Sequence, residues 1–438
     1  LSYVNRTTDW LEKRYPDTQI ESVNAGVSDT ATNFGVYRLN DQLMNENGHD
    51  MPDLVFVEFT SNDWVYDDCI KQSKKDIRRQ IESLVRNIYE KNPYADIVFV
   101  FTARSENASS RPVYMEVAEE YGIPTVDMGI AMQKKMNERG TANESSGSYY
   151  YTVDNLHPST EGYGIYFEEI QKVLTPYLAA PVYYAAKADH TATLPNALSR
   201  SLWTSPVILP TSSFTVSGNA AKSGSLNVTL FGTSKTASRS VAFTPDSLTV
   251  TEEGTTISFE FTGTTLALPF FMTSSGINMD YTLDGKDVKN LTVDTDFLSF
   301  QRYAHTQLFV LEQELAYGTH TVELTFRATS DGKVNVRLGG ACVAGEDNHL
   351  DKLIALSIDD GPRNESSNAI LDVLEKYGAH ATFFSVGSSV NTSVYAVMQR
   401  MVAADCEIGN HGYGWNSMAN MTEAELQDDF NKTQNRIY

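Results

Sequence analysis

The sequence is poor in cysteine, in basic side chains and in long apolar runs, and each shortage excludes a class of protein. Its three cysteines, Cys69, Cys342 and Cys406, have neither the spacing of a disulfide framework nor that of a zinc ribbon. We expect them to be small buried apolar side chains. Apolar runs such as residues 97–101 fall far short of the ~18 residues that a membrane span needs, so the sequence predicts no membrane span.

Basic residues are also few beside the acidic ones, because 34 Lys and Arg against 56 Asp and Glu give a net charge of −22. This charge repels phosphate backbones, so we expect no nucleic-acid partner and no binding to anionic membrane surfaces. Apolar residues make up 41% of the chain and charged residues 21%, as in folded globular proteins. The 438 residues correspond to about three domains at roughly 150 residues each.

The first segment, residues 1–186, alternates strand and helix signals. Residues 54–59 and 97–101 are short, almost continuous apolar runs, which is typical of strands buried on both faces. Between them an amphipathic helix is predicted by apolar residues at helical spacing, and a last helix is predicted over residues 160–178. The helix between the strands carries Ile77, Ile81, Leu84, Val85, Ile88 and Tyr89 on one stripe. The order strand, helix, strand, helix predicts a parallel sheet in a three-layer α/β domain.

The second segment, residues 187–345, is rich in Thr, Ser, Val and Gly. Residues 258–261, 279–283 and 320–326 alternate with period two, and turns such as 283–286 separate the predicted strands. This pattern predicts an all-β sandwich. Aromatic residues on such strands stack on sugar rings if they are exposed, and fill the core of a plain spacer if they are buried. The sequence leaves both interpretations open.

The third segment, residues 346–438, returns to an α/β pattern. Residues 353–358 and 381–386 are predicted to form buried strands, and residues 367–377 and 394–403 are predicted to form helices. We expect these elements to begin a further α/β domain and to stop before it is complete. The chain starts at Leu1 rather than Met, so we expect it to be part of a longer protein.

A first candidate site lies just ahead of the last helix of the first segment. Asp154 stands three residues before His157, so its carboxylate can accept the imidazole Nδ1 proton and leave Nε2 to act as a general base. Gly26 lies in a segment that we expect to follow a strand and to open a helix, which would present its backbone amide to a ligand oxygen. Asn62 follows the strand at 54–59, at the edge where open α/β sheets place their ligands, and its amide is a suitable oxyanion donor.

In this order the three blocks resemble the SGNH, or GDSL-like, hydrolase family over residues 1–180. The resemblance implies a flavodoxin-like three-layer fold, with Gly26 and Asn62 as oxyanion donors, His157 as the base and Asp154 as its orienting partner. The catalytic serine of that family lies in a block ahead of the Gly block, and no such block precedes Asn24. We therefore expect the nucleophile to lie upstream of Leu1 and these residues to be inert as an esterase by themselves. Glu58, an acid inside an apolar strand, is expected to tune this site, to be a paired buried carboxylate or to lie at a partly exposed strand end.

A second candidate site lies in the third segment. Asp359 and Asp360 form an adjacent carboxylate pair at a strand end, where one can bind a divalent metal and the other can take a proton from the metal's water. With residues 379–387 and the run that ends at His411, they resemble the NodB-homology polysaccharide deacetylases, whose fold is a distorted β/α barrel. The resemblance implies that Asp359 is the catalytic base and that Asp360 and His411 hold the metal, zinc or a similar ion.

The second site departs from the family pattern at position 415. A second histidine of the family falls there, and this chain has Trp415, whose indole offers no lone pair to a metal. One Asp and one His are too few for a tight zinc site, which normally uses at least three protein ligands. A decayed, carbohydrate-binding module is therefore a second hypothesis for this segment beside an active deacetylase.

Together the two resemblances imply a secreted carbohydrate-active hydrolase, extracellular or at the cell surface, that removes acetyl groups from a cell-wall polysaccharide. The middle segment would be a jelly-roll-like sandwich of the kind often joined to carbohydrate esterases. The expected partner is an acetylated polysaccharide. The alternatives are a polysaccharide-binding protein whose catalytic sites have both decayed, and a lipase or phospholipase.

Overall fold

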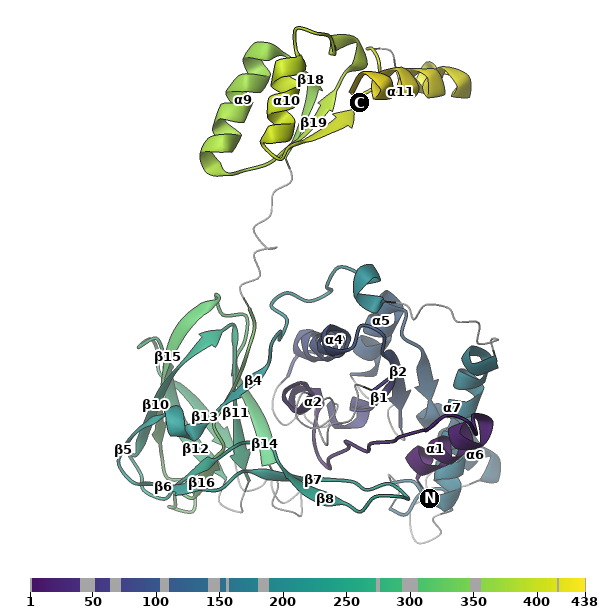
Figure 1. Cartoon of the computed structure of the whole chain (residues 1–438). Coiled ribbons are helices and arrows are strands. Elements are labelled where there is room, and N and C mark those ends of the chain that lie inside the picture. The colour runs from purple at the N-terminus through teal and green to yellow at the C-terminus, as the bar shows by residue number, and fades with distance from the viewer. Residues whose placement is uncertain are drawn as a thin grey trace. The chain divides into compact units, whose positions relative to one another are not determined.

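The computed structural model describes residues 2–39, 52–63, 72–102, 110–140, 150–154, 157–179, 189–272, 276–293, 306–346, 356–415 and 417–437. The chain divides into two compact units, residues 1–348 and residues 349–438 (Figure 1). The first two segments distinguished by composition thus lie within one unit. None of the described helices combines the length and the apolar character that crossing a bilayer requires.

A parallel sheet with helices on both faces forms the first half of the first unit. The sheet has the order β1 (Leu54–Val57), β2 (Asp96–Phe101), β3 (Thr125–Asp127). Its side chains alternate between two cores, one that contains Val57 and Phe99 and one that contains Val98 and Val100. The first core is covered by α2 (Thr32–Leu39), α4 (Lys74–Lys91) and α5 (Arg111–Tyr121), and the second by α1 (Tyr3–Arg14), α6 (Met128–Arg139) and α7 (Thr160–Ala179). Helices thus lie on both faces of this parallel sheet.

Helix α4 illustrates why the sequence folds locally as predicted. Ser73 and Asp76 form a capping box at its first turn, which satisfies backbone N–H groups that have no partner within the helix. Its predicted apolar stripe is buried along its whole length, from Ile77 to Tyr89. The packing of this stripe against β1 and β2 fixes the orientation of the helix on the sheet.

Two antiparallel sheets form the second half of the first unit. The five-stranded sheet has the order β13-β12-β15-β10-β5, the larger sheet has the order β4-β17-β11-β16-β9-β6 with β14 paired to β11, and β7 pairs with β8. The strands are β4 (Val207–Leu209), β5 (Thr215–Ser217), β6 (Ala220–Ser223), β7 (Asn227–Leu230), β8 (Arg239–Ala242), β9 (Ser247–Val250), β10 (Thr256–Gly263), β11 (Thr265–Phe271), β12 (Ile277–Leu283), β13 (Lys289–Val293), β14 (Thr306–Glu312), β15 (Gly318–Phe326), β16 (Val336–Leu338) and β17 (Ala341–Ala344).

Aromatic side chains of the sandwich mostly fill its core. Phe259 and Phe326 from the five-stranded sheet pack with Phe270 and Phe309 from the larger sheet. This burial favours the packing role over the sugar-stacking role for these aromatic residues. Cys342 is a buried free thiol of the sandwich, and Cys406 is a buried free thiol of the second unit, as predicted. Cys69 lies outside the described residues.

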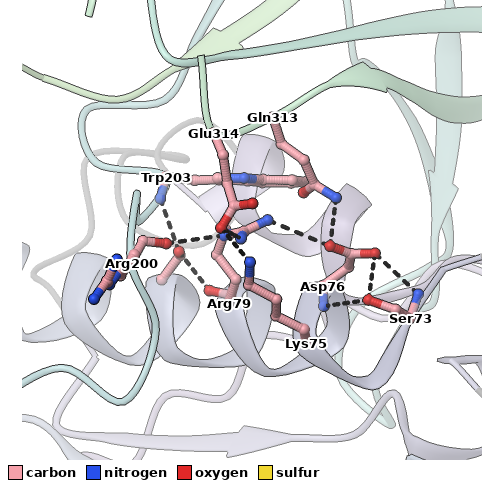
Figure 2. A network of polar contacts seen from close by, with 9 residues as sticks. Ser73, Lys75, Asp76, Arg79, Arg200, Trp203, Gln313 and Glu314 are labelled. Atoms are coloured by element: carbon pink, nitrogen blue, oxygen red, sulfur yellow. Dashed lines mark hydrogen bonds and ion pairs between the residues drawn. The ribbon is translucent and has the colours of Figure 1, made fainter. Parts of the chain in front are cut away.

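The polar side of α4 forms the interface between the two halves of the first unit. Figure 2 shows Arg79, which is 0% exposed, donating to the Arg200 carbonyl at 3.0 Å and to Glu314 Oε1 at 2.5 Å. Glu314 also accepts from Lys75, and Gln313 Nε2 donates to Asp76 Oδ1 at 2.5 Å. Because the charges of α4 are paired with residues of the linker and the sandwich, the two halves are joined by a specific polar contact.

The segment between the two halves is held to α4 as well. Glu82, which is buried, accepts from the backbone N–H groups of Leu198 and Ser199 at 2.7 and 2.8 Å. Asn87 Nδ2 donates to the carbonyl of Trp203 at 2.9 Å, and the Trp203 ring is completely buried. This part of the connection is thus packed against the helix.

The second unit contains the parallel sheet β18 (Ser357–Gly361), β19 (Thr382–Ser385), β20 (Glu407–Asn410) with α9 (Asn364–Tyr377), α10 (Tyr395–Ala403) and α11 (Glu423–Ile437). Its core contains Leu371, Phe383 and Met401. The strand predicted over 353–358 differs from the observed one: residues 353–355 lie outside the described residues, and β18 continues to Gly361. The residues of β18 are exposed or half-buried, not buried as predicted, because β18 is an edge strand paired with β19.

Candidate functional sites

Asp154 and His157 are in direct contact. His157 Nδ1 lies 2.6 Å from Asp154 Oδ2, and the backbone N–H of His157 donates to Asp154 Oδ1 at 2.7 Å. One carboxylate therefore fixes both the ring and the backbone of the histidine, and a proton held on Nδ1 by that carboxylate leaves Nε2 as the basic nitrogen. The side chains are 67% exposed at His157 and 51% exposed at Asp154, so the pair is open to a substrate.

A tight turn ahead of α7 carries this pair. Val153 N–H donates to the His157 carbonyl at 2.8 Å, and Ser159 N–H donates to the Tyr151 carbonyl at 2.9 Å. No residue larger than glycine fits at position 162, in the first turn of α7, because a Cβ atom there would lie 2.1 Å from the Tyr151 carbonyl oxygen. The segment that carries Asp154 and His157 thus packs directly against the start of α7.

Two contacts place the start of α7 near the carboxyl edge of the parallel sheet. A Cβ atom at Gly162 would lie 3.1 Å from Met132 Cε, and Met132 belongs to the early part of α6, which begins directly after β3. The ring of Tyr163 lies 6.3 Å from that of Tyr3, and burial raises the pKa of Tyr3, with the nearby charge of Glu58, just after β1, adding to the shift. The start of α7, just after the Asp154–His157 pair, therefore lies beside α6 and α1.

Asn62 lies in the first helical turn after β1 and is bonded to the segment that contains Gly26. Its Nδ2 donates to the Thr30 carbonyl at 2.7 Å. The neighbouring Asp63 is buried and accepts from Thr32 N–H at 2.9 Å and from the Tyr114 hydroxyl at 2.8 Å. The structure thus joins Asn62 to Thr30, four residues after Gly26. The sequence analysis does not single out Asp63, although its position directly after Asn62 indicates a carboxylate close to the site.

Gly26 differs from the expectation in two respects. Among the described residues no strand precedes it, and α2 begins only at Thr32. Its N–H is not bare, because it donates to Asn24 Oδ1 at 3.0 Å. The physical reason is that an Asn two residues ahead of an amide can bond it locally, which favours a turn over the start of a helix.

Glu58 is a paired carboxyl beside this site. Thr102 Oγ1, just after β2, donates to Glu58 Oε1 at 3.0 Å. Burial raises the pKa of Glu58 to about 7, the Thr102 hydrogen bond opposes that shift, and the nearby Asp63 charge adds to it. Of the interpretations of Glu58, the structure shows both pairing and a half-buried position directly after β1. A carboxyl that changes its charge near neutral pH also lies at the carboxyl edge of the sheet.

In the second unit, His411 and Asp360 come together across the ends of β20 and β18. His411 Nε2 lies 3.2 Å from Asp360 Oδ1. Asp359 and Asp360 belong to β18 itself rather than to the segment after it, and Asp360 has a left-handed φ of 67°. Two of the residues expected to hold a metal are thus adjacent.

The remaining donors do not complete a metal site. Within the described parts of the chain, no three His, Cys, Asp or Glu side chains stand close enough to hold one ion. Trp415 is 65% exposed and supplies no ligand. The described residues therefore do not fit the zinc-like centre implied by the resemblance, which normally needs three protein ligands.

Two family models match parts of the chain. One, described as a GDSL-like lipase/acylhydrolase family, matches residues 2–165, and the other, described as polysaccharide deacetylase, matches residues 346–438. Both resemblances inferred from the motifs are thereby confirmed. The chain is a multidomain protein in which a GDSL-like segment precedes a deacetylase-like segment.

Curated relatives match through a short region of the chain. A bifunctional xylanase/deacetylase of Pseudobutyrivibrio xylanivorans is 37% identical over 94 residues, which is 22% of this chain and 15% of that protein. The peptidoglycan-N-acetylmuramic acid deacetylase PdaC of Bacillus subtilis (strain 168) is 40% identical over 86 residues, 20% of this chain and 18% of that protein. The chain thus spans less than a fifth of the length of either relative.

A solved structure resembles a much larger part of the chain. It is that of a two-domain esterase (CEX) active on acetylated mannans, with a TM-score of 0.57 and 18% identity. The match covers 78% of this chain and 85% of that structure. At this identity the likeness establishes a shared fold.

Proposed function

We propose that the first unit is a carbohydrate esterase that removes acetyl groups from a polysaccharide by acyl transfer. The observation that carries the proposal is the double contact of Asp154 with the ring and the backbone of His157. An exposed imidazole oriented by a carboxylate is the general base that ester hydrolysis by acyl transfer requires.

In the proposed reaction His157 Nε2 removes the proton from a serine hydroxyl, whose oxygen attacks the acetyl carbon. The resemblance assigns this serine to a block ahead of Gly26. As the sugar oxygen leaves, His157 returns the proton to it, and a water activated in the same way then releases acetate from the serine. Asp154 holds the imidazole in one tautomer and stabilises its charged form throughout.

Asn62 and Gly26 are proposed to bind the negatively charged oxygen of the tetrahedral intermediate. The Asn62 amide nitrogen carries two hydrogens, one of which binds the Thr30 carbonyl, so the second is assigned to the oxyanion. The Gly26 N–H is assigned the same role by exchange, because a charged oxygen is a stronger acceptor than the Asn24 side-chain carbonyl that it now binds.

We also propose a specific fold type for each part of the chain. We assign the α/β half of the first unit to the flavodoxin-like SGNH type, the two-sheet half to a jelly roll, and the second unit to the start of a distorted β/α barrel of the NodB type. The domains would span residues 1–186, 187–345 and 346–438. The curated relatives are named for xylanase, deacetylase and peptidoglycan deacetylase activities, which supports an extracellular or cell-surface polysaccharide as substrate.

The test is acetate release from acetylated xylan, acetylated mannan and p-nitrophenyl acetate, measured with the full-length natural protein. The His157→Ala variant should lose about 10³-fold or more in kcat/KM, because it removes the general base. The His190→Ala variant is the matched control, since His190 stacks on Tyr89 away from the pair. Unchanged turnover in His157→Ala would end the assignment, and hydrolysis of long-chain esters alone would favour a lipase.

For the second unit a different observation favours a second function, the binding of a polysaccharide without catalysis. The described residues bring only Asp360 and His411 together as metal ligands, while Trp415 presents an exposed ring four residues beyond His411. Exposed indole rings bind sugar faces through apolar contact. The divalent metal of the deacetylases is not part of this proposal.

Titration calorimetry with acetylated and deacetylated oligosaccharides tests the second function in the whole protein. The Trp415→Ala variant should weaken binding at least about tenfold, because an aromatic contact is worth roughly 1.4 kcal/mol or more. Tyr395→Ala, which removes another exposed ring of the same unit, is the control and should bind as before. Stoichiometric zinc and metal-dependent acetate release in the purified protein would instead support an active deacetylase.

A further inference from the structure

The sandwich contacts the loop that carries Gly26, defined here as residues 24–31 and called the Gly26 loop. Gln307, at the start of β14, is 5% exposed, and its Nε2 donates to the Asp29 carbonyl at 2.9 Å. Asp29 has a left-handed φ of 58°, a conformation that costs energy for a residue with a Cβ atom. A donor from the sandwich therefore holds the loop at its most strained residue.

The β7–β8 hairpin contacts the same loop at a second point. Phe231 N–H donates to the Gly26 carbonyl at 3.4 Å, and Asn24 Nδ2 donates to the Gly232 carbonyl at 3.5 Å. Figure 1 shows β7 and β8 extending from the sandwich towards α1, and Ser234 N–H donates to Asn5 Oδ1 at 2.7 Å there. The hairpin thus lies along the α/β half of the unit.

A third contact lies directly behind the loop, at the start of α2. The rings of Phe34 and Phe243 are stacked with centroids 4.2 Å apart, and Asn33 Nδ2 donates to the Leu308 carbonyl at 3.5 Å. Leu308 follows Gln307 on β14. Because stacked rings and buried amides have little freedom, the sandwich forms a rigid support behind the loop.

The loop is held from the other side by the end of β1. The Gly26 and Asp29 carbonyls of the loop accept from the sandwich, and its Thr30 carbonyl accepts from Asn62. Its Ala25 carbonyl accepts from Arg38 of α2. Outside regular secondary structure a backbone stays in one conformation only when such groups are satisfied. The loop that carries the Gly26 amide is therefore held by Asn62, by Arg38 of α2 and by the sandwich together.

We propose that Gln307 is a positioning residue, through which the sandwich fixes the Gly26 loop in the geometry that oxyanion binding requires. The proposal rests on the proposed esterase function of the first unit and deepens it. The sandwich then acts on the reaction by holding an amide donor in place, without itself touching the substrate. A donor that is misplaced by about 1 Å can lower a rate by up to 10²-fold, so a hydrogen bond of this kind is sufficient to matter.

The experiment compares Gln307→Met with Gln313→Met in the full-length natural protein. Both substitutions replace a glutamine amide of the sandwich by an apolar side chain of similar length at the same interface. Gln313 binds Asp76 of α4 and not the loop, which makes it the matched control. Hydrogen exchange of residues 24–33 and the separate values of kcat and KM for acetate release are measured, together with thermal unfolding.

Gln307→Met should raise amide exchange in residues 24–33 by about fivefold, as expected for the loss of one net hydrogen bond. It should lower kcat by roughly tenfold with little change in KM, because the lost contact acts on the transition state. Gln313→Met should leave both the exchange of the loop and kcat unchanged. Equal loop exchange in the two variants, or faster exchange with unaltered kcat, would overturn the positioning role.

The two proposals fail in different ways. If the parent protein releases no acetate from any ester while Gln307→Met still loosens the loop, the esterase assignment fails and the structural contact stands. If acetate release depends on His157 but Gln307→Met behaves like Gln313→Met, the positioning role alone fails.

Discussion

Glu58 and Thr102 join the carboxyl ends of two neighbouring parallel strands, with the threonine hydroxyl 3.0 Å from the Glu58 carboxyl oxygen. The bond satisfies one oxygen of a half-buried acid directly after β1, and burial still raises the pKa of Glu58 to about 7. The carboxyl is thus largely neutral at weakly acidic pH and largely charged at alkaline pH, in a place where charge is unfavourable.

Glu58→Gln should make the stability of the first unit less dependent on pH. The folded state holds the Glu58 proton up to about pH 7, whereas the unfolded state releases it near 4.5. The stabilising contribution of the neutral carboxyl is therefore complete below about pH 4.5 and lost as the pH rises through 7. Between pH 5 and 8 we expect wild type to lose up to about 3 kcal/mol relative to Glu58→Gln, measured by urea unfolding.

The control for this experiment is Glu90→Gln, which removes an exposed carboxyl of α4 in the same unit. It accounts for the general effect of losing one negative charge from an acidic protein. A wild-type pH profile that runs parallel to that of Glu58→Gln would show that the carboxyl is not desolvated in the folded state.

Asp154→Asn should slow acetate release by roughly 10³-fold while the protein stays folded. The amide that replaces the carboxylate cannot stabilise a charged imidazole, and it can hold the ring in the wrong tautomer. Steady-state kinetics on p-nitrophenyl acetate give the rate, and thermal unfolding shows whether the fold is retained. Glu161→Gln, the same type of change at a carboxylate in the first turn of α7, should keep nearly full activity.

Arg79→Met should destabilise the first unit by about 3 kcal/mol in urea unfolding. Arg79 is fully buried, and its loss leaves Asp76 and Glu314 without their shared guanidinium and the Arg200 carbonyl without its donor. Arg78→Met is the control, because Arg78 forms a partly exposed ion pair with Glu116 that is worth about 1 kcal/mol at most. Equal losses in the two variants would contradict the role assigned to the buried interface.

Trp415→His should create a zinc site in the second unit. The new imidazole would join Asp360 and His411, which already lie 3.2 Å apart, and so raise the number of protein ligands to three. We expect zinc affinity to rise by at least about 100-fold in calorimetric titration, since the third ligand is a direct metal donor. Trp415→Phe serves as the control and should bind zinc as weakly as wild type, and a wild-type protein that binds zinc equally tightly would refute the argument.

Much of the α/β fold follows from the sequence because its local patterns have a single physical solution. The apolar stripe of α4 can be buried only as a helix, and the run at 97–101 can be buried on both faces only as a central strand. The Asp154–His157 contact was predictable for a similar reason, since three residues in a turn bring a carboxylate to an imidazole.

The rest depended on contacts between segments far apart in the chain. Arg79 and Glu82 lie on the polar face of α4, which by its pattern alone indicates a surface exposed to water, yet the linker and the sandwich cover both. Gln307 and Asp29 are separated by 278 positions, and neither residue type signals the other. The prediction that Gly26 opens a helix with a bare amide was wrong, because its amide bonds the Asn24 side chain and this bond competes with a helix start.

The buried guanidinium of Arg79 and the stacked Phe34 have a consequence for how such a chain can be recombined. A gene fusion cut between the two halves of the first unit would expose the apolar ring, leave Arg79 in water without Glu314 and release the Gly26 loop from Gln307. A foreign module joined to the α/β half would therefore have to cover Phe34, supply an acidic partner for Arg79 and bind the Gly26 loop. The transferable building block is the pair of halves, inherited or engineered together.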